Sequence, residues 1–227
     1  MKKEVIVLSL GGSLIIPDNV DKKYLEALKK ILLKNTKNYK FIIVCGGGSL
    51  ARKYIYALDK HNSMFQSLAG ISATRTNARF MNYFFKINPR KGIPHSMKAL
   101  KRYLKTQEIT FCGALEYHPD QTSDSTAAEI AKKLKTKFIN LTNVAGLYTD
   151  NPKKNKNAKF ISKISWKDFE KRANFIKFKP GQHFVLDQSA AKIIKENQIP
   201  TYIIGKNIQQ LDNLLKGKKF KGTEISG

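Results

Sequence analysis

The chain has 227 residues, of which 41% are hydrophobic, so it can form one sizeable domain or two lobes that share a core. No window of about 18 uncharged apolar residues exists, which excludes a transmembrane helix. The apolar run after the basic N-terminus, "VIVLSL", is shorter than that of a signal peptide, so we expect a cytoplasmic protein.

The charge is strongly basic, with 42 Lys and Arg against 17 Asp and Glu and a net charge of +25. The lysines are spread over the whole chain in short groups such as "KKNK", without interleaved aromatic residues. This pattern fits a general lysine bias or an anionic small substrate. We expect no membrane partner and no specific nucleic-acid partner, although polyanions will bind weakly at low salt.

Apolar runs alternate with helical periodicity along the chain. The first half is predicted to form, in order, a strand, a helix, a strand and two helices, at 4–10, 21–35, 40–45, 49–60 and 68–86. Asp21 is a plausible N-cap of the first helix. The last of these helices carries polar Thr74, Arg75 and Asn77 in an apolar pattern, so we expect Arg75 and Asn77 to face a ligand or an interface.

In the second half, a short strand and turn at 91–96 precede a helix that ends near 105. Strands are then predicted at 108–113, 137–142, 200–205 and, as an edge strand, 222–225. Helices are predicted at 124–135, 165–173, 187–197 and 208–217, and a polar loop at 143–160. This order predicts an α/β fold with a mostly parallel sheet and helices on both faces. Such sheets bind ligands at the carboxyl ends of their strands.

Two glycine loops follow the first two predicted strands. The first reads Gly11-Gly12-Ser13, and the second reads "CGGGSLARKY", with Gly46-Gly47-Gly48 followed by Arg52. Glycines let backbone N–H groups approach a phosphate closely, and a helix N-terminus adds a positive dipole end. Arg52 could add a bidentate contact. Either loop alone could be a tight turn, but the pair indicates a phosphate site that is neither a P-loop nor a dinucleotide motif.

Two more strand ends carry polar groups. Asp124 begins a helix after Thr122-Ser123, where it could cap the helix or orient lysines or a metal. The stretch "YTDNPKKNKN" could be an exposed lysine loop, or its Tyr148 and Asp150 could hold a base and a ribose.

Together these motifs resemble those of archaeal-type uridylate (UMP) kinases of the amino-acid kinase superfamily. The matching segments cover nearly the whole chain in family order: "GGSLIIPDNVD", "VCGGGSLARKYI", "GISATRTNARF", "HPDQTSDSTAAEIA", "TNVAGLYTDNPKKNKNAKFISKIS", "VLDQSAAKII" and the "GT-x-I" ending. The resemblance implies a three-layer α/β/α sandwich and Mg²⁺-dependent transfer of the ATP γ-phosphate to UMP in pyrimidine nucleotide biosynthesis. It also implies one domain over 1–227, with an acceptor lobe at about 1–115 and an ATP lobe at about 116–227, and a homohexamer built from dimers.

The resemblance further implies a set of site residues. Those at the reaction centre are Gly12, Ser13 and Asp124, with Asp124 an organiser rather than a base. Those that hold UMP are Gly46, Gly47, Arg52, Thr74 and Thr122, with Arg75 beside them. Those that hold ATP are Gly11, Gly12, Ser13, Gly48, Thr142, Asn143, Gly146, Tyr148, Asp150 and Pro152. The nucleotide phosphates are expected to hold Mg²⁺, without protein ligands.

The sequence departs from this pattern at four positions. Ser9 stands where many superfamily members have a lysine that stabilises the transferring group. Lys192 could replace that lysine or could be an ordinary surface residue of its helix. Ser67 stands where an aspartate reads the uracil, and Ala145 and Asp120 replace an aspartate and a glycine of the family loops.

Two alternatives to a UMP kinase stay open at this stage. One is another phosphate-acceptor kinase of the same fold, such as an isopentenyl phosphate kinase, which is expected to carry a histidine in the acceptor pocket. His118 instead matches the UMP kinase loop, and His61 and His95 do not fit that pattern. The other alternative is a non-catalytic module that binds an anion or nucleotide.

Overall fold

The computed structural model describes residues 3–59, 61–87, 89–118, 122–150, 152, 155–174 and 186–227. None of the helices in these ranges is both long and apolar enough to cross a membrane.

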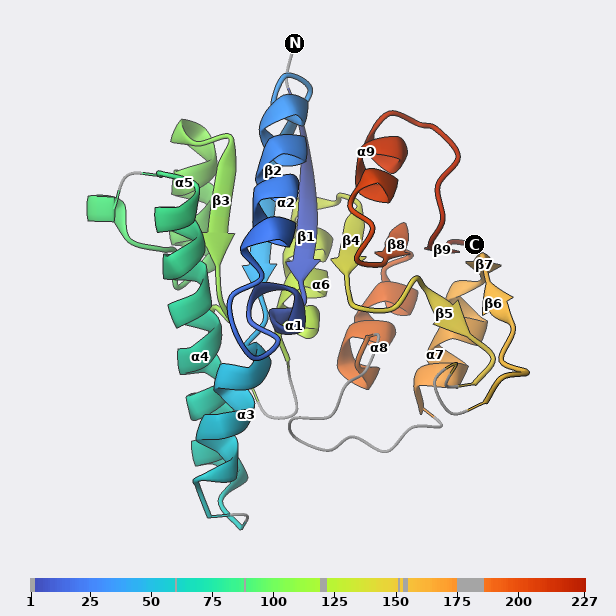
Figure 1. Cartoon of the computed structure of the whole chain (residues 1–227), viewed down its shortest axis with the longest axis horizontal. Helices are drawn as coiled ribbons and strands as arrows, with labels where there is room; N and C mark the ends of the chain where they lie inside the picture. Colours follow the sequence, from blue (N-terminus) through green and yellow to red (C-terminus); the bar gives the residue numbers. More distant parts are fainter. Residues whose placement is uncertain are drawn as a thin grey trace.

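A seven-stranded sheet runs through this described part of the chain, in the order β3-β2-β1-β4-β8-β9-β7 (Figure 1). The strands are β1 Glu4–Leu10, β2 Tyr39–Cys45, β3 Ile109–Cys112, β4 Phe138–Leu141, β7 Lys163–Ile164, β8 Thr201–Ile204 and β9 Thr223–Ile225. Only the β8–β9 pair is antiparallel, which confirms the predicted mostly parallel sheet. A separate antiparallel pair joins β5 Leu147–Tyr148 to β6 Phe160–Ile161.

Helices cover both faces of this sheet. They are α1 Gly12–Ile15, α2 Lys22–Asn35, α3 Gly48–Tyr56, α4 Ser63–Phe84, α5 Met97–Thr106, α6 Ser123–Leu134, α7 Trp166–Asn174, α8 Gln188–Glu196 and α9 Gln209–Leu215, with a 3₁₀ turn at Pro89–Lys91. Figure 1 shows α3 and α4 running side by side past the carboxyl ends of the strands. Asp21 caps α2 as predicted, because its carboxylate accepts a hydrogen bond from the Tyr24 N–H at 3.1 Å.

The alternation of side chains along β1 divides the hydrophobic core into two halves. Ile6, Leu8 and Leu10 belong to one cluster, with buried residues of α1, α2, α4 and α9. Val7 points the other way, into a second cluster with residues of α5, α6, α7 and α8. The molecule therefore has three layers, as expected.

Three local predictions were wrong. Residues 91–96 form no strand: a 3₁₀ turn ends at Lys91 and coil follows. The predicted loop at 143–160 contains β5 and the start of β6, whose two residues each are too few to show an alternating pattern. β9 is not an edge strand, because β7 pairs with its outer side.

The register of the sheet brings the candidate loops together. Leu10, the last residue of β1, lies between Cys45 of β2 and Leu141 of β4. The residues that follow these three strands therefore emerge side by side at one edge of the sheet.

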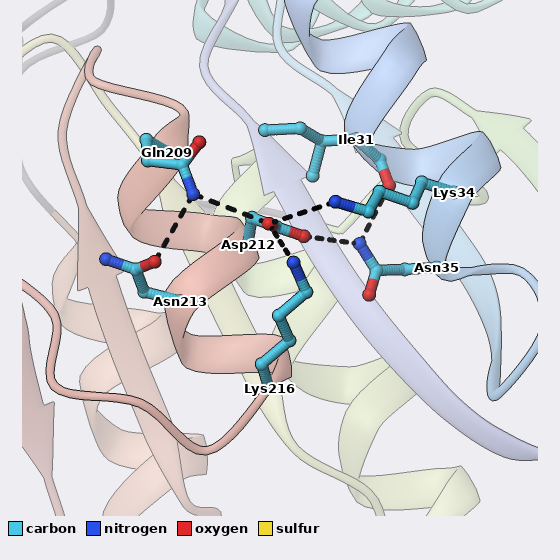
Figure 2. Close-up of polar contacts among 7 residues, drawn as sticks. All are labelled: Ile31, Lys34, Asn35, Gln209, Asp212, Asn213 and Lys216. Carbon is cyan, nitrogen blue, oxygen red and sulfur yellow. Dashed lines mark hydrogen bonds and ion pairs between the residues drawn. The ribbon is translucent and has the colours of Figure 1, made fainter.

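A polar cluster ties α2 to α9 on one face of the sheet (Figure 2). Asp212 is buried and accepts hydrogen bonds from Asn35 Nδ2 at 2.9 Å and from the Lys216 ammonium, while Lys34 Nζ lies 3.8 Å away. Burial alone would raise the pKa of Asp212, but the bonds from Lys216 and Asn35 outweigh it and lower the pKa from 3.8 to about 2. The ionised carboxylate therefore stabilises the folded state.

We expect Asp212→Asn to lower the free energy of unfolding by about 1–2 kcal/mol at neutral pH. Because the folded pKa is depressed, this stabilisation is present above the unfolded value of 3.8 and is lost as the pH falls toward about 2. Urea unfolding at pH 7 and at about pH 3 checks this prediction. The difference in unfolding free energy between the variant and wild type should be smaller at the lower pH. Glu26→Gln, which removes an exposed 3.8 Å pair with Lys22, is the control with little effect. An equal loss at both pH values would contradict the electrostatic explanation.

Candidate active site

The two glycine loops pack directly against each other at the ends of β1 and β2. A Cβ on Gly12 would lie 2.0 Å from the Gly48 nitrogen, and Gly48 itself has φ +62. A Cβ on Gly46 would lie 2.5 Å from the Gly12 nitrogen. No residue other than glycine fits at this contact, so these glycines serve the close approach of two backbones. The loops thus form one continuous backbone surface, with Ser13 at the start of α1.

Arg52 lies at the middle of α3, one helical turn after Gly48 of the second glycine loop. Its side chain is half-buried and has no hydrogen-bond or ion-pair partner among the described residues. A guanidinium held near a helix N-terminus without a partner is available for an anion.

The polar residues inside α4 support the loops rather than face open space. Asn77 donates from Nδ2 to the carbonyl oxygens of Gly46 at 2.7 Å and Gly47 at 3.1 Å. Arg75 donates to the carbonyls of Ala114 and Leu115, which follow β3, at 3.1 and 2.7 Å. Hydrogen bonds to backbone carbonyls therefore offset the cost of burying Arg75 and Asn77. The ligand or interface that the sequence predicted is not needed for this.

Thr74 is buried and also contacts the segment after β3. Its hydroxyl donates to the Ile71 carbonyl at 2.7 Å and accepts from the Ala114 N–H at 3.0 Å. A Cβ on Gly113 would lie 2.6 Å from this hydroxyl, so the residue after β3 must be a glycine for α4 to pack there. Thr74 thus positions the exit of β3 beside the glycine loops.

The N-terminus of α6 supplies the third side of the site. Thr122, and not Asp124, is the N-cap: its hydroxyl accepts from the Asp124 N–H at 3.1 Å, and Ser125 completes a capping box. Asp124 is free of the capping role and reaches β1, where Ser9 donates to its Oδ1 at 2.5 Å. Ser9 shares a face with Val7, on the side of the sheet that α6 covers.

The electrostatics of Asp124 are unusual for a carboxyl group. Burial and the negative charge of Asp187 raise the pKa of Asp124 from 3.8 to about 7, although the hydrogen bond from Ser9 acts against this rise. Asp124 therefore titrates near neutral pH.

Asp187 is a site residue that the sequence analysis did not single out. It caps α8, because its Oδ1 accepts from the Ala190 N–H at 2.8 Å, and it also accepts from the hydroxyls of Thr122 and Ser125. The N-termini of α6 and α8 are thereby joined. The start of "DQSAA" indicates an N-cap, but no local signal identifies its partners 62 and 65 residues earlier.

The residues predicted to hold ATP follow β4. Thr142 continues the sheet, with its N–H donating to the Ile204 carbonyl at 2.9 Å, and the exposed Asn143 comes next. Gly146 is buried, and a Cβ there would lie 2.6 Å from Thr223 Oγ1 and 2.8 Å from the Phe160 ring. This turn is therefore held tightly against β6 and β9.

Farther along, Tyr148 packs edge-on against Phe160, with ring centroids 5.3 Å apart. Asp150 and Pro152 are exposed, and Asp150 accepts from Asn155 Nδ2 at 2.8 Å. Tyr148 is therefore packed within the β5–β6 pair, whereas Asp150 and Pro152 face solvent.

Lys192 does not join the other site residues. It lies on the exposed side of α8, where its ammonium is 3.9 Å from Glu196. Ser67 is partly exposed in the first half of α4, and Ala145 lies in the turn after β4. Asp120 lies outside the described residues.

Together, the described groups form an edge of backbone amides, helix N-termini and one free guanidinium. Such an arrangement can bind phosphate groups and align them, without supplying a covalent nucleophile. Phosphoryl transfer between two bound phosphates is a reaction that depends on such positioning and charge-neutralising groups.

Comparisons with known proteins agree with this chemistry. The model of the amino acid kinase family matches residues 4–205. A protein named uridylate kinase from Thermococcus sibiricus is 34% identical over 224 residues, which cover 97% of this chain and 98% of its own. One of the same name from Pyrococcus abyssi is 33% identical over the same lengths.

The fold comparison gives the same family. The crystal structure of uridylate kinase from Archaeoglobus fulgidus superposes with a TM-score of 0.81 at 30% identity, and covers 97% of this chain and 99% of that one. The chain therefore belongs to the amino acid kinase family, where its sequence and fold are similar to those of archaeal uridylate kinases.

Proposed function

We propose that this protein is a UMP kinase that transfers the γ-phosphoryl group of ATP to UMP, giving UDP and ADP. The observation that supports the proposal is the contact between the two glycine loops, which brings two bare backbone segments together at one sheet edge. Full-length relatives named uridylate kinase support UMP as the acceptor.

In this proposal each group has a positioning or charge-neutralising role. Gly46, Gly47 and Arg52 hold the UMP phosphate, with Thr74 and Thr122 along the acceptor. Gly11, Gly12, Ser13 and Gly48 surround the transferring group, and the segment from Thr142 to Pro152 borders the adenine and ribose. Alignment of this kind supplies most of the catalysis in phosphoryl transfer.

We propose that Mg²⁺ enters with ATP and is held mainly by phosphate oxygens, as is usual for this ion. The described residues contain no group of three or more His, Cys, Asp or Glu side chains that could hold a metal alone. When bound, Mg²⁺ would neutralise phosphate charge. The chain's own contribution is the amides of the glycine loops and Arg52.

An ADP-release assay with ATP and Mg²⁺ tests the function, with UMP, CMP, AMP and isopentenyl phosphate compared as acceptors. We expect a strong preference for UMP. Preference for another acceptor would mean that the base pocket differs, consistent with Ser67 replacing the expected aspartate. No turnover by folded protein with any acceptor would favour a binding module instead.

We also propose a cytoplasmic homohexamer built from dimers. Exposed apolar side chains gather where α3 ends and α4 begins, namely Tyr54, Tyr56, Met64 and Phe65, and Tyr56 is 86% exposed. A second copy of the chain would remove this surface from water. The solution mass, measured by light scattering, tests the assembly, and a monomer would contradict it.

A further inference from the structure

Asp124 is a carboxyl group at the candidate phosphoryl site, and none of the described side chains gives it a cationic partner. No Lys or Arg among the described residues pairs with it, and its carboxyl accepts a hydrogen bond from the Ser9 hydroxyl at 2.5 Å. The position of Ser9 is where the superfamily resemblance places a lysine. An ionised Asp124 would therefore repel incoming phosphates, and no cation of the described residues would offset that repulsion.

The groups around Asp124 make ionisation harder still. Asp187, at the start of α8, is the one charged side chain of the described residues that acts on it. The lysines of α8 point elsewhere: Lys192 pairs with Glu196 and Lys195 with Glu170. On α6, Lys132 lies 3.6 Å from Glu129, and on β2 Lys40 donates to the Leu104 carbonyl. β1 and β4 bring no charge beyond Glu4, which pairs with Lys137 at 3.1 Å.

The hydrogen bonds decide which carboxyl keeps a proton. Asp187 accepts from three donors: the Thr122 and Ser125 hydroxyls and the Ala190 N–H. Donors of this kind stabilise an ionised carboxylate. Asp124 accepts only from Ser9 in the described structure, at Oδ1. Two neighbouring carboxyls do not both ionise readily, so the proton belongs on Oδ2 of Asp124.

We propose that Asp124 acts as a neutral carboxylic acid that donates a hydrogen bond from Oδ2 to a phosphoryl oxygen, and that Asp187 is the positioning residue that keeps it protonated. This inference rests on the proposed phosphoryl-transfer function. No proton is transferred in the step: the hydrogen bond strengthens as charge develops on the phosphoryl group. A carboxyl kept neutral by its surroundings is a competent donor. The proton thus takes the place of the lysine that is absent at Ser9.

The pH dependence of kcat/KM is the first test. Because the protonated form is active, we expect kcat/KM for ATP to fall as the pH rises from about 7 to about 9. Asp187→Asn removes the charge that raises the pKa of Asp124, so the falling limb should move to lower pH. Glu26→Gln, on the exposed side of α2, is the matched carboxyl control and should leave the profile unchanged.

Two further variants separate a neutral donor from an anionic organiser. Asp124→Asn keeps a donor at the same place, so it should lose no more than about tenfold in kcat/KM and should abolish the falling limb. Ser9→Lys should ionise Asp124 and should also remove the falling limb of the pH profile. When Asp124→Asn is added to Ser9→Lys, the loss in kcat/KM should be far larger than the loss caused by Asp124→Asn in the wild-type protein. A wild-type rate that is flat or rises with pH, or a folded Asp124→Asn variant without activity, would overturn the inference.

Infrared difference spectra give a readout that does not depend on turnover. A carboxylic-acid carbonyl band should be present at neutral pH, should strengthen when ATP binds and should be missing in Asp124→Asn. If no UDP forms at any pH but the band is present, only the proposed function is rejected, because the band still shows that Asp124 carries a proton. Absence of the band in a protein that makes UDP would reject the inference alone.

Discussion

Gly12→Ala is expected to lower kcat/KM for UMP phosphorylation by about 100-fold or more, because a displacement of about 1 Å between reacting groups costs that much. The new Cβ would lie 2.0 Å from the Gly48 nitrogen and 2.6 Å from its Cα, so the two loops must separate. The phosphates they hold would separate with them. Initial rates with ATP and UMP measure the effect, and circular dichroism checks that the variant is folded.

The matched control for this change is Gly70→Ala. Gly70 lies inside α4, and a Cβ there meets nothing closer than Ile55 Cδ1 at 3.7 Å. Its activity should be unchanged, and its stability should rise by about 1 kcal/mol through helix propensity. A folded Gly12→Ala variant with activity within a few-fold of wild type would show that the loop contact does not set the reaction geometry.

Arg52→Ala is expected to raise the KM for UMP by about 10- to 100-fold, with a smaller change in kcat. Hydrogen bonds to a charged group contribute about 1.5–3 kcal/mol, and Arg52 has no partner in the described structure that would share this role. For the same reason the variant should unfold at the same urea concentration as wild type. Steady-state kinetics over UMP concentration at fixed ATP provide the measurement.

Two companion variants sharpen this result. Arg52→Lys should recover only part of the affinity, because an ammonium lacks the bidentate fork. Lys53→Ala removes the neighbouring exposed cation and should leave the KM unchanged apart from a small salt-dependent term. Equal KM increases for the Arg52 and Lys53 changes would point to overall charge rather than a specific phosphate contact.

Local patterns in the sequence predicted the elements that carry the site. These patterns depend only on neighbouring residues, so they can be recognised without a structure. They are the apolar runs of β1 and β2, the N-cap at Asp21 and the glycines after each of the two strands. Because parallel strands share one carboxyl edge, the meeting of the two glycine loops was also predictable. The short strands β5, β6 and β7 were not, since two residues carry no period.

By itself, then, the sequence determined the α/β class, the position of the two glycine loops at one sheet edge and the family. Only the tertiary structure decided how the polar side chains pair there. Ser9 meets Asp124 across 115 residues, and Thr122 meets Asp187 across 65. These contacts depend on α6 packing against both β1 and α8. That arrangement follows from burying whole faces of helices and strands, a global requirement that no short segment encodes.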